Sequence, residues 1–400
     1  MSFLNEAMAI KQAIVEDRRY LHQNAELSLE LPKTSAYVVK RLKEMGYEPE
    51  ILGDYGVKAV AGGKKPGKVF LIRGDMDALP ILEESDLPFK SETGAMHACG
   101  HDFHTSMLLG AAQLLKNHEA EIEGKVTLMF QPAEETLLGA QMMIDNGILK
   151  NPDVDAAMMI HMQAAGEAPS AGTVIVNNVD AGAAAADWFV IRVQGKGCHG
   201  AYPDMGVDPL NVLAHLHLAL QAINAREVGP ATALSLTVGQ MHGGLTANVI
   251  PDTAMMTGTI RTLDNKVRDF AKERVKAICE TIGAAFRAEV TVTFEAGCPV
   301  VMPDYDVNRE LRDYTLEMMG PDCVLDKSEI PVKSRGMGSE DFACVAAEVP
   351  SAAFNLSGGS VAEGHTFPLH HPKVKFNEDA LPVGAAVYAN GAFQWLKNHK

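Results

Sequence analysis

Three short runs of sequence decide the fold: VFLIRGDMD (residues 69–77), VTLMFQPAEE (residues 126–135) and AAMMIH (residues 156–161). Each begins with a mainly apolar stretch that is too short for a helix and is typical of a buried strand. The segments around them alternate between helical and strand patterns, as in sheets covered by helices. We therefore expect an α/β domain with a mixed, mostly parallel sheet flanked by helices.

Each of the three runs ends in a polar cluster. These clusters supply Asp75 and Asp77, Glu134 and Glu135, and His161. In open α/β sheets the ligand site lies beyond the carboxyl ends of the strands. The sequence therefore predicts that three separate strands deliver potential ligands to one edge of the sheet.

A second pattern begins near residue 187. It predicts a strand, a helix, two strands, a helix and a strand, at residues 188–193, 209–225, 233–238, 254–261, 266–282 and 289–294. This β-α-β-β-α-β order is that of a ferredoxin-like α+β domain. We expect such a domain at residues 187–296, inserted into a discontinuous catalytic domain made of residues 1–186 and 297–400.

Composition excludes several classes of partner and location. The net charge of -16 repels phosphate backbones, so we expect no nucleic-acid partner, and no basic block favours a membrane surface. No apolar stretch approaches the roughly 20 residues that a bilayer span needs, and the N-terminus does not resemble a signal peptide. The six cysteines are widely spaced, which does not indicate a disulfide framework. These features predict a reduced, cytoplasmic protein.

The segment MHACGHDFHTSMLLGAAQLL (residues 96–115) places Cys99 and His101 two residues apart before an apolar helical pattern. A thiolate and an imidazole at that spacing can reach one metal ion. The spacing does not match a structural zinc finger, which uses two paired clusters. A reduced core cysteine beside polar residues at a helix start explains this segment equally well.

The other polar clusters also have two interpretations. In QPAEE, one carboxylate can bind a metal while its neighbour accepts a proton, or both can interact with the dipole of a helix expected from Leu137. His161 alone is more typical of a core histidine, and His370 and His371 of a solvated loop. Asp77 is best placed to orient a metal-bound histidine. Taken together at the strand ends, these residues predict a metal site.

Eight motifs occur in an order that resembles a known family. They are RGDMDALPI, MHACGHDFHTSMLLGAA, FQPAEE, the histidine after MMI, HGAYPDMGVDPL, TANVIPD, GSEDFA and LHHPKVKFNEDALPVGAAVYAN. The chain resembles the amidohydrolases related to aminoacylase and carboxypeptidase G, a branch that includes hippurate hydrolases, N-acyl-amino-acid amidohydrolases and auxin-conjugate hydrolases. The similarity runs from about Arg18 to the C-terminus.

This resemblance implies a centre of two divalent metal ions (zinc, manganese, cobalt or nickel) in each subunit. It implies five ligands, namely Cys99, His101, Glu135, His161 and His370. Glu134 would be the general base that deprotonates a metal-bound water. His370 is preferred to His371, because many relatives carry Asn or Ser at the second position.

The resemblance further implies that the inserted domain mediates a homodimer. His199 of HGAYP would then help to polarise the substrate carbonyl, and Asn248 of TANVIPD would contact the substrate. Turn and packing roles are the alternative for both. Arg261 is an isolated cation at a strand end, suited either to a substrate carboxylate or to a surface salt bridge. Asp204 stands where many relatives have histidine, which leaves the substrate preference open.

The predicted function is metal-dependent hydrolysis of the amide bond of a small N-acyl amino acid. Dipeptidase or carboxypeptidase action is the nearest alternative, because the chemistry is the same. A non-catalytic relative is disfavoured by the presence of Glu134 beside every expected ligand. A phosphoesterase would need a phosphate cradle or an arginine cluster, and neither is evident.

Overall fold

The computed structural model describes residues 2–165, 168–176, 181–327 and 336–400. The chain divides into two compact units. The first unit contains Met1–Gly182, Met302–Lys333 and Cys344–Lys400, and the second contains Ala183–Val301 and Ser334–Ala343. The second unit is thus inserted into the chain of the first.

The first unit is built on an eight-stranded mixed sheet in the order β1-β2-β4-β3-β5-β14-β6-β13. Its strands are β1 (Glu50–Leu52), β2 (Gly56–Gly62), β3 (Val69–Asp75), β4 (Lys125–Gln131), β5 (Ala156–Gln163), β6 (Val174–Val176), β13 (Val324–Asp326) and β14 (Ser351–Ser357). The four central strands β4, β3, β5 and β14 run parallel to one another. Their carboxyl ends therefore meet at one edge, as the sequence predicts.

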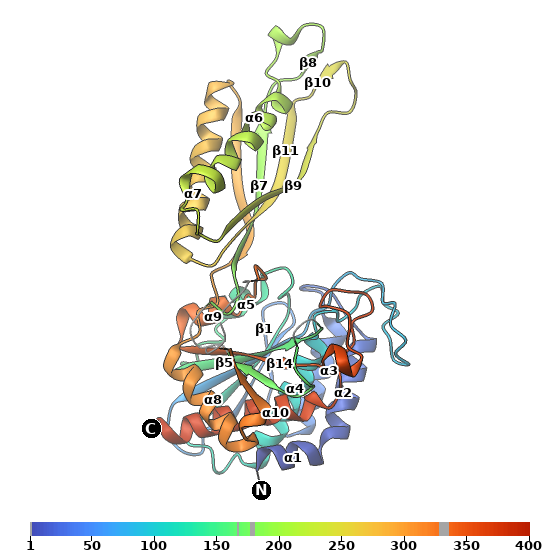
Figure 1. The fold of residues 1–400 in the computed structure, drawn as a ribbon, viewed down its shortest axis with the longest axis vertical. Helices are drawn as coiled ribbons and strands as arrows, with labels where there is room; N and C mark the ends of the chain where they lie inside the picture. The colour runs from blue at the N-terminus through green and yellow to red at the C-terminus, as the bar shows by residue number, and fades with distance from the viewer. Residues whose placement is uncertain (1, 166–167, 177–180, 328–335) are drawn as a thin grey trace. The chain divides into compact units, whose positions relative to one another are not determined.

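Helices cover this sheet (Figure 1). They are α1 (Phe3–Ala9), α2 (Lys11–Gln23), α3 (Pro32–Glu44), α4 (His101–Asn117), α5 (Gly139–Asp145), α8 (Tyr305–Met319), α9 (Ala343–Glu348) and α10 (Ala380–Asn398). Helices α4 and α10 pack against each other and against β3. All seven residues of β3 are buried, as is nearly all of α4. The main core thus includes β3 and α4, next to the strand ends that carry the candidate ligands.

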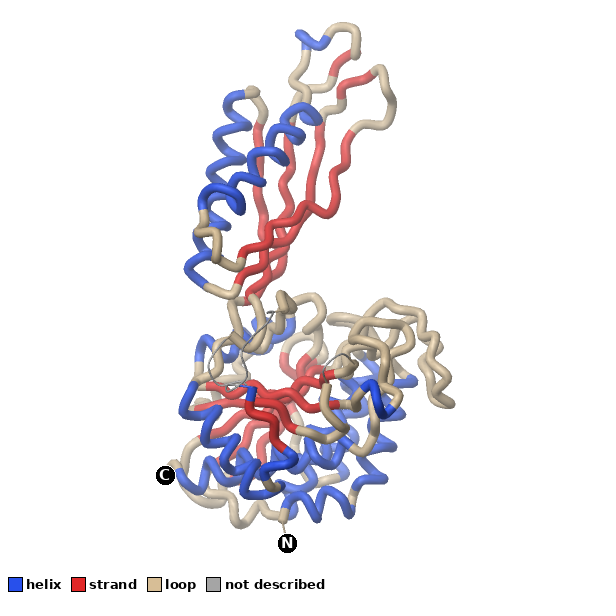
Figure 2. Tube along the Cα trace, viewed as in Figure 1, coloured by secondary structure: helices blue, strands red, loops and turns tan. Residues whose placement is uncertain are grey.

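The second unit has a four-stranded antiparallel sheet in the order β12-β7-β11-β9. Its elements are β7 (Ala185–Gln194), β8 (Cys198–His199), α6 (Pro209–Ala222), β9 (Leu234–Gly243), β10 (Val249–Ile250), β11 (Thr253–Thr262), α7 (Asn265–Ala285) and β12 (Glu289–Cys298). Both helices pack on one face of the sheet, as Figure 2 shows. Asp208 and Asp264 cap α6 and α7 by accepting hydrogen bonds from backbone amides of the first turn.

The predicted fold class is confirmed: a mixed sheet flanked by helices carries an inserted ferredoxin-like α+β unit. Within the described residues, no helix combines the length and apolar character needed to cross a bilayer.

Candidate metal centre

The strand ends of the first unit bring the expected ligands together. Helix α4 begins at His101, and Cys99 lies just before it, separated by Gly100 in the left-handed conformation (φ 94°). His161 lies inside β5, two residues before the strand ends at Gln163. Glu134 and Glu135 follow β4, and His370 comes from a loop of the C-terminal segment.

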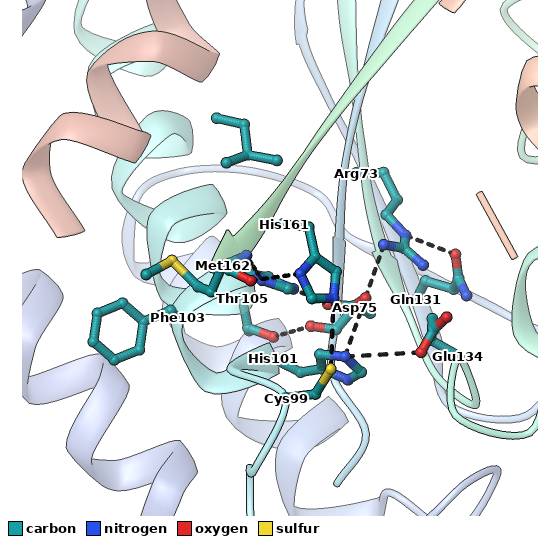
Figure 3. Close-up of polar contacts among 12 residues, drawn as sticks. Arg73, Asp75, Cys99, His101, Phe103, Thr105, Gln131, Glu134, His161 and Met162 are labelled. Carbon is teal, nitrogen blue, oxygen red and sulfur yellow. Dashed lines mark hydrogen bonds and ion pairs between the residues drawn. The ribbon is translucent and has the colours of Figure 1, made fainter. Parts of the chain in front are cut away.

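Six of these side chains form what we term the metal-centre cluster: Cys99, His101, Glu134, Glu135, His161 and His370. The Cys99 Sγ atom lies 3.5 Å from Nε2 of His161 and 3.3 Å from Nε2 of His370. Glu135 Oε1 lies 3.6 Å from Nε2 of His370 and 3.9 Å from Nε2 of His101. Figure 3 shows Cys99, His101, Glu134 and His161 pointing toward one another. Cys99 belongs to two candidate metal-binding groups, one with His101 and His161 and the other with Glu135 and His370.

Two of the histidines are already oriented for ligation. Nδ1 of His101 donates to the carbonyl oxygen of Asp77 at 2.9 Å, and Nδ1 of His161 donates to that of Met162 at 2.7 Å. A carbonyl can only accept, so each ring carries its proton on Nδ1. The lone pair of Nε2 is then available to a cation in the neutral form of each ring, which is the usual arrangement of metal-bound histidines.

The cluster also contains polar atoms that the protein leaves unsatisfied. Among the described residues, His101 Nε2 and Glu135 Oε1 are buried and have no hydrogen-bond partner. Such atoms are costly in a protein interior unless a ligand or ion satisfies them. The donor set of one thiol, three imidazoles and carboxylates suits zinc and similar divalent ions. The residues present therefore fit a divalent metal centre.

The pKa shifts of His161, Glu135 and Cys99 point the same way. Burial lowers the pKa of His161 to about 3, so its ring is neutral at pH 7. Burial raises the pKa of Glu135 to about 7 and also raises the pKa of the Cys99 thiol. These two groups are thus poorly stabilised as anions by the protein alone, and a bound cation would favour their charged, ligating forms.

Asp77 connects three members of the cluster. Its carbonyl oxygen holds His101, whereas its two carboxylate oxygens accept the backbone amides of Glu134 and Glu135 at 3.0 and 3.1 Å. The carboxylate also lies 3.3 Å from Nδ1 of His101. A single buried side chain therefore sets the backbone of both glutamates as well as the environment of one histidine.

The segment after β4 differs from the helix expected from Leu137. Residues 134–137 form turns, and α5 begins only at Gly139. Ala133 and Leu137 have positive φ angles (56° and 57°), which interrupt a helical path. A Cβ atom at Gly139 would lie 1.6 Å from the Pro132 carbonyl oxygen, so glycine is required where the loop closes.

The two adjacent histidines of the C-terminal loop have different surroundings. His370 has a positive φ of 64°, and its amide donates to the Ala98 carbonyl beside Cys99. The ring of His371 instead stacks on Phe367, and its Nδ1 accepts the amide of Lys373 at 3.0 Å. Only His370 is therefore brought to the cluster by this loop.

The expected site residues of the second unit lie at two different places. His199 in β8 pairs with Val249 in β10, directly after Asn248, whose carbonyl accepts the amide of Gly200. His199 and Asn248 are thus neighbours, and both are exposed. Arg261 lies at the opposite end of β11, where its guanidinium donates to the Met337 carbonyl and to Ser339.

Two further residues lie beside the cluster: Asp75, expected among the potential ligands at the strand ends, and His104, for which no role was predicted. Asp75 Oδ2 is 3.6 Å from Nε2 of His101, and Asp75 Oδ1 is 2.5 Å from Nδ1 of His104. The spacing of three residues between His101 and His104 places both on one face of α4. That spacing was the available signal for His104, whereas the contact with Asp75 depends on tertiary packing.

Comparisons with known proteins agree with this geometry. Residues 71–393 match the family described as peptidase family M20/M25/M40. The chain is 38% identical to the N-acetyl-L-cysteine deacetylase of Bacillus subtilis, over 93% of this chain and 85% of that protein. It is 36% identical to thermostable carboxypeptidase 2 of Saccharolobus solfataricus, over 96% of both chains.

A solved structure from Bacillus subtilis, described as a dinuclear metal-binding peptidase of the M20 family, superposes with a TM-score of 0.77. Its sequence is 30% identical, and the match covers 98% of this chain and 99% of that chain. With the family match, the two relatives and this structure in agreement, the chain belongs to peptidase family M20/M25/M40 and is a metal-dependent hydrolase of amide bonds.

Proposed function

We propose that the protein hydrolyses the amide bond of small N-acyl amino acids, using two divalent ions held by the metal-centre cluster. The observation that supports this most strongly is the convergence of unsatisfied ligand atoms, His101 Nε2 and Glu135 Oε1, around the Cys99 thiol. Cys99, His101, Glu135, His161 and His370 are the ligands in this proposal. When bound, such ions lower the pKa of water and polarise the amide carbonyl.

Glu134 acts as the general base in this proposal. Its carboxylate Oε2 lies 3.8 Å from Nε2 of His101, and its backbone amide donates to the carboxylate of Asp77. It takes the proton of the attacking water and passes that proton to the departing amine. The position of Glu135 supports this division, because its Oε1 lies near both His101 and His370, where it would serve as a ligand.

The metal identity follows the character of the donors. A thiolate from Cys99 is a softer ligand than a carboxylate, so zinc, cobalt or nickel fits better than magnesium. A cytoplasmic location belongs to the same proposal, because a thiol ligand needs a reducing compartment and the six cysteines are widely spaced in the sequence.

The second unit supplies the substrate contacts and the dimer interface in this proposal. His199 and Asn248 form an exposed pair that can polarise a carbonyl and hold a substrate, and Arg261 can bind a carboxylate. Strand β9 is an edge strand with an exposed second half, a surface that another copy can cover. A fully active monomer in gel filtration and light scattering would contradict both the dimer and a contribution of His199 across it.

Carboxypeptidase action is the second candidate. The relative from Saccharolobus solfataricus named thermostable carboxypeptidase 2 is nearly as similar as the deacetylase. Both reactions cleave an amide beside an amino-acid carboxylate, so the metal centre serves either one equally. The two candidates differ only in the acyl group on the other side of the cleaved amide bond, which is a simple acyl group in one case and an aminoacyl or peptidyl group in the other.

The test is a metal analysis joined to a substrate panel. The purified protein is assayed on N-acetyl amino acids, hippurate and dipeptides, before and after removal of metal by a chelator. We expect two metal ions per chain, loss of hydrolysis on chelation and recovery on adding back zinc, cobalt, nickel or manganese. Higher kcat/KM on dipeptides than on acyl amino acids would favour the second candidate, and full activity without metal would overturn the proposal.

A further inference from the structure

Strands β3 and β5 separate before they reach the metal centre. They are parallel neighbours, but their paired register ends at Arg73 and Met159. Strand β3 nevertheless continues to Asp75, and β5 continues to Gln163. The segment of β5 that carries His161 therefore lacks a backbone ladder on its β3 side, although β14 still pairs with it on the other side.

Two buried side chains fill this gap. The hydroxyl of Tyr388, from α10, donates to the Arg73 carbonyl at 2.6 Å and accepts the Ile160 amide at 2.9 Å. The ring of His104, from α4, lies between Asp75 Oδ1 (2.5 Å) and the Met162 amide (2.8 Å). The amides on both sides of His161 are thus held by side chains.

The contacts of His104 define its protonation. Nε2 accepts the backbone N–H of Met162, so it carries no proton, and Nδ1 donates to the Asp75 carboxylate. Asp75, His101 and His104 lie close enough to share a cation, but both ring nitrogens of His104 are engaged. His104 therefore has no lone pair to offer a metal, and its role must be exerted through other residues.

The rest of the surroundings makes this arrangement rigid. Arg73 pairs with Asp75 Oδ2 at 2.8 Å and also donates to Gln131 at 2.9 Å, as Figure 3 shows. Thr105 donates to the Asp75 carbonyl at 2.6 Å. A Cβ atom at Gly74 would lie 2.8 Å from the His104 carbonyl oxygen, so this glycine allows α4 to approach β3 closely.

We propose that Asp75 and His104 form a positioning bridge that holds β5 away from β3 and places His161 for metal binding. The connection is continuous: His104 holds the amide of Met162, and the Met162 carbonyl accepts Nδ1 of His161. The inference rests on the proposed metal centre and adds to it a reason for the position of one ligand. His104 and Asp75 are positioning residues and contact neither substrate nor metal in this scheme.

Two substitutions of His104 test its contact with Asp75 and its contact with the Met162 amide separately. In His104→Asn, the short amide can still donate to Asp75 but does not reach Met162. In His104→Gln, the longer amide can offer its oxygen to the Met162 amide. Tyr388→Phe is the matched control, because it removes a buried hydrogen-bonding group between the same two strands without changing the link from Met162 to His161.

The measurement is Co²⁺ titration of each metal-free protein, followed by visible absorption, with far-UV circular dichroism to verify folding. We expect His104→Asn to bind one of the two ions about 10- to 100-fold more weakly with an altered cobalt spectrum, the range typical when a residue behind a ligand is lost. We expect His104→Gln to restore most of the affinity, and Tyr388→Phe to lower thermal stability while keeping the wild-type spectrum.

Wild-type cobalt affinity and spectrum in folded His104→Asn would overturn the inference, as would equal weakening in all three variants. If His104→Asn does not fold, His104→Gln decides alone: a wild-type-like spectrum supports the bridge to Met162, and a changed one contradicts it. Failure of the wild-type protein to bind two ions would instead overturn the proposed metal centre, and this inference with it.

Discussion

Two groups of buried histidines and carboxylates lie next to each other at the start of α4. The first is the metal-centre cluster, which includes His101. The second, which we term the ion-pair cluster, consists of Arg18, His22, Glu83 and Asp102. The two share the same residue types, and His101 and Asp102 are adjacent in the chain. Their partners differ, and this difference separates a ligand site from a structural network.

The ion-pair cluster balances its own charges. Asp102 Oδ2 accepts from Arg18 Nε at 2.7 Å and lies 2.9 Å from Nδ1 of His22. Nε2 of His22 lies 3.1 Å from both oxygens of Glu83, whose carboxylate also accepts the amide of Ser91. Among the described residues, no candidate metal-binding group includes any of the four members. Arg18 and the ring of His22, when protonated, therefore pair both carboxylates without a bound ion.

The metal-centre cluster has a surplus of anionic and neutral donors instead. Two glutamates and a thiol surround His101, while its Nε2 atom has no hydrogen-bond partner within the described part of the chain. The comparison teaches that a buried cluster of acids and histidines indicates function only when its own cations do not pair its anions. Each prediction below tests one side of this contrast.

The largest effect is expected from the two neighbouring glutamates. Glu134→Gln should keep both metal ions yet lower kcat by a factor of about 100 to 10,000, because it removes the general base. Glu135→Gln should lose bound metal, because it removes a ligand. Metal content by elemental analysis and turnover of the best panel substrate check both. Near-native turnover in metal-loaded Glu134→Gln would show that another group takes the proton.

The next effect concerns the ion-pair cluster. Arg18→Met removes a buried cation that contacts Asp102 and Glu378 and stacks on Phe89 and Phe103. Breaking such a buried pair costs about 3 to 5 kcal/mol of stability. Urea unfolding of the metal-free protein measures this loss, and the folded variant should still bind two metal ions. Loss of metal without loss of stability would remove the distinction between the clusters.

Asp77 tests how the metal-centre cluster is held. In Asp77→Asn the side chain keeps one acceptor oxygen, so it can hold only one of the two glutamate amides, whereas the backbone carbonyl still orients His101. We expect metal affinity to fall about 10- to 100-fold, as measured by competition with a coloured chelator. Unchanged affinity would mean that the carboxylate of Asp77 plays no part in placing Glu135.

The smallest effect is a pH dependence in the ion-pair cluster. Burial and Arg18 lower the pKa of His22, but hydrogen bonds to Asp102 and Glu83 outweigh them and raise it above 6.5. A raised folded-state pKa stabilises the protein fully below the unfolded-state value, and this contribution disappears as the pH rises through the folded-state value. The stability advantage of wild type over His22→Gln should therefore be greatest below about pH 6.5.

Urea unfolding of both metal-free proteins between pH 5.5 and 8 checks this dependence. A stability difference that grows with pH would show that His22 is neutral in the folded protein. That result would contradict the charge balance of the ion-pair cluster, whereas the metal-centre cluster would be unaffected.

Much of the fold and of the candidate site was predictable from the sequence. The apolar runs ending in RGDMD, QPAEE and His161 correspond to β3, β4 and β5, and the β-α-β-β-α-β pattern corresponds to the second unit. Strand and helix periodicity depend on neighbouring residues, so they can be recognised locally. Cys99, Glu134 and Glu135 were candidates from local motifs, but each motif alone had a structural explanation that was at least as good, and their roles followed from the resemblance to a family.

Only the tertiary structure determined the hydrogen-bond partners, and hence the role, of each of three histidines. His22, His104 and His161 are the same residue type, but His22 is paired with carboxylates, His104 joins Asp75 to β5, and Nε2 of His161 lies against Sγ of Cys99. These contacts join residues that are distant in the chain, such as His370 and Cys99. The chemical state of a buried histidine depends on its hydrogen-bond partners, and the packing of α4 against α2, β3 and β5 brings those partners together.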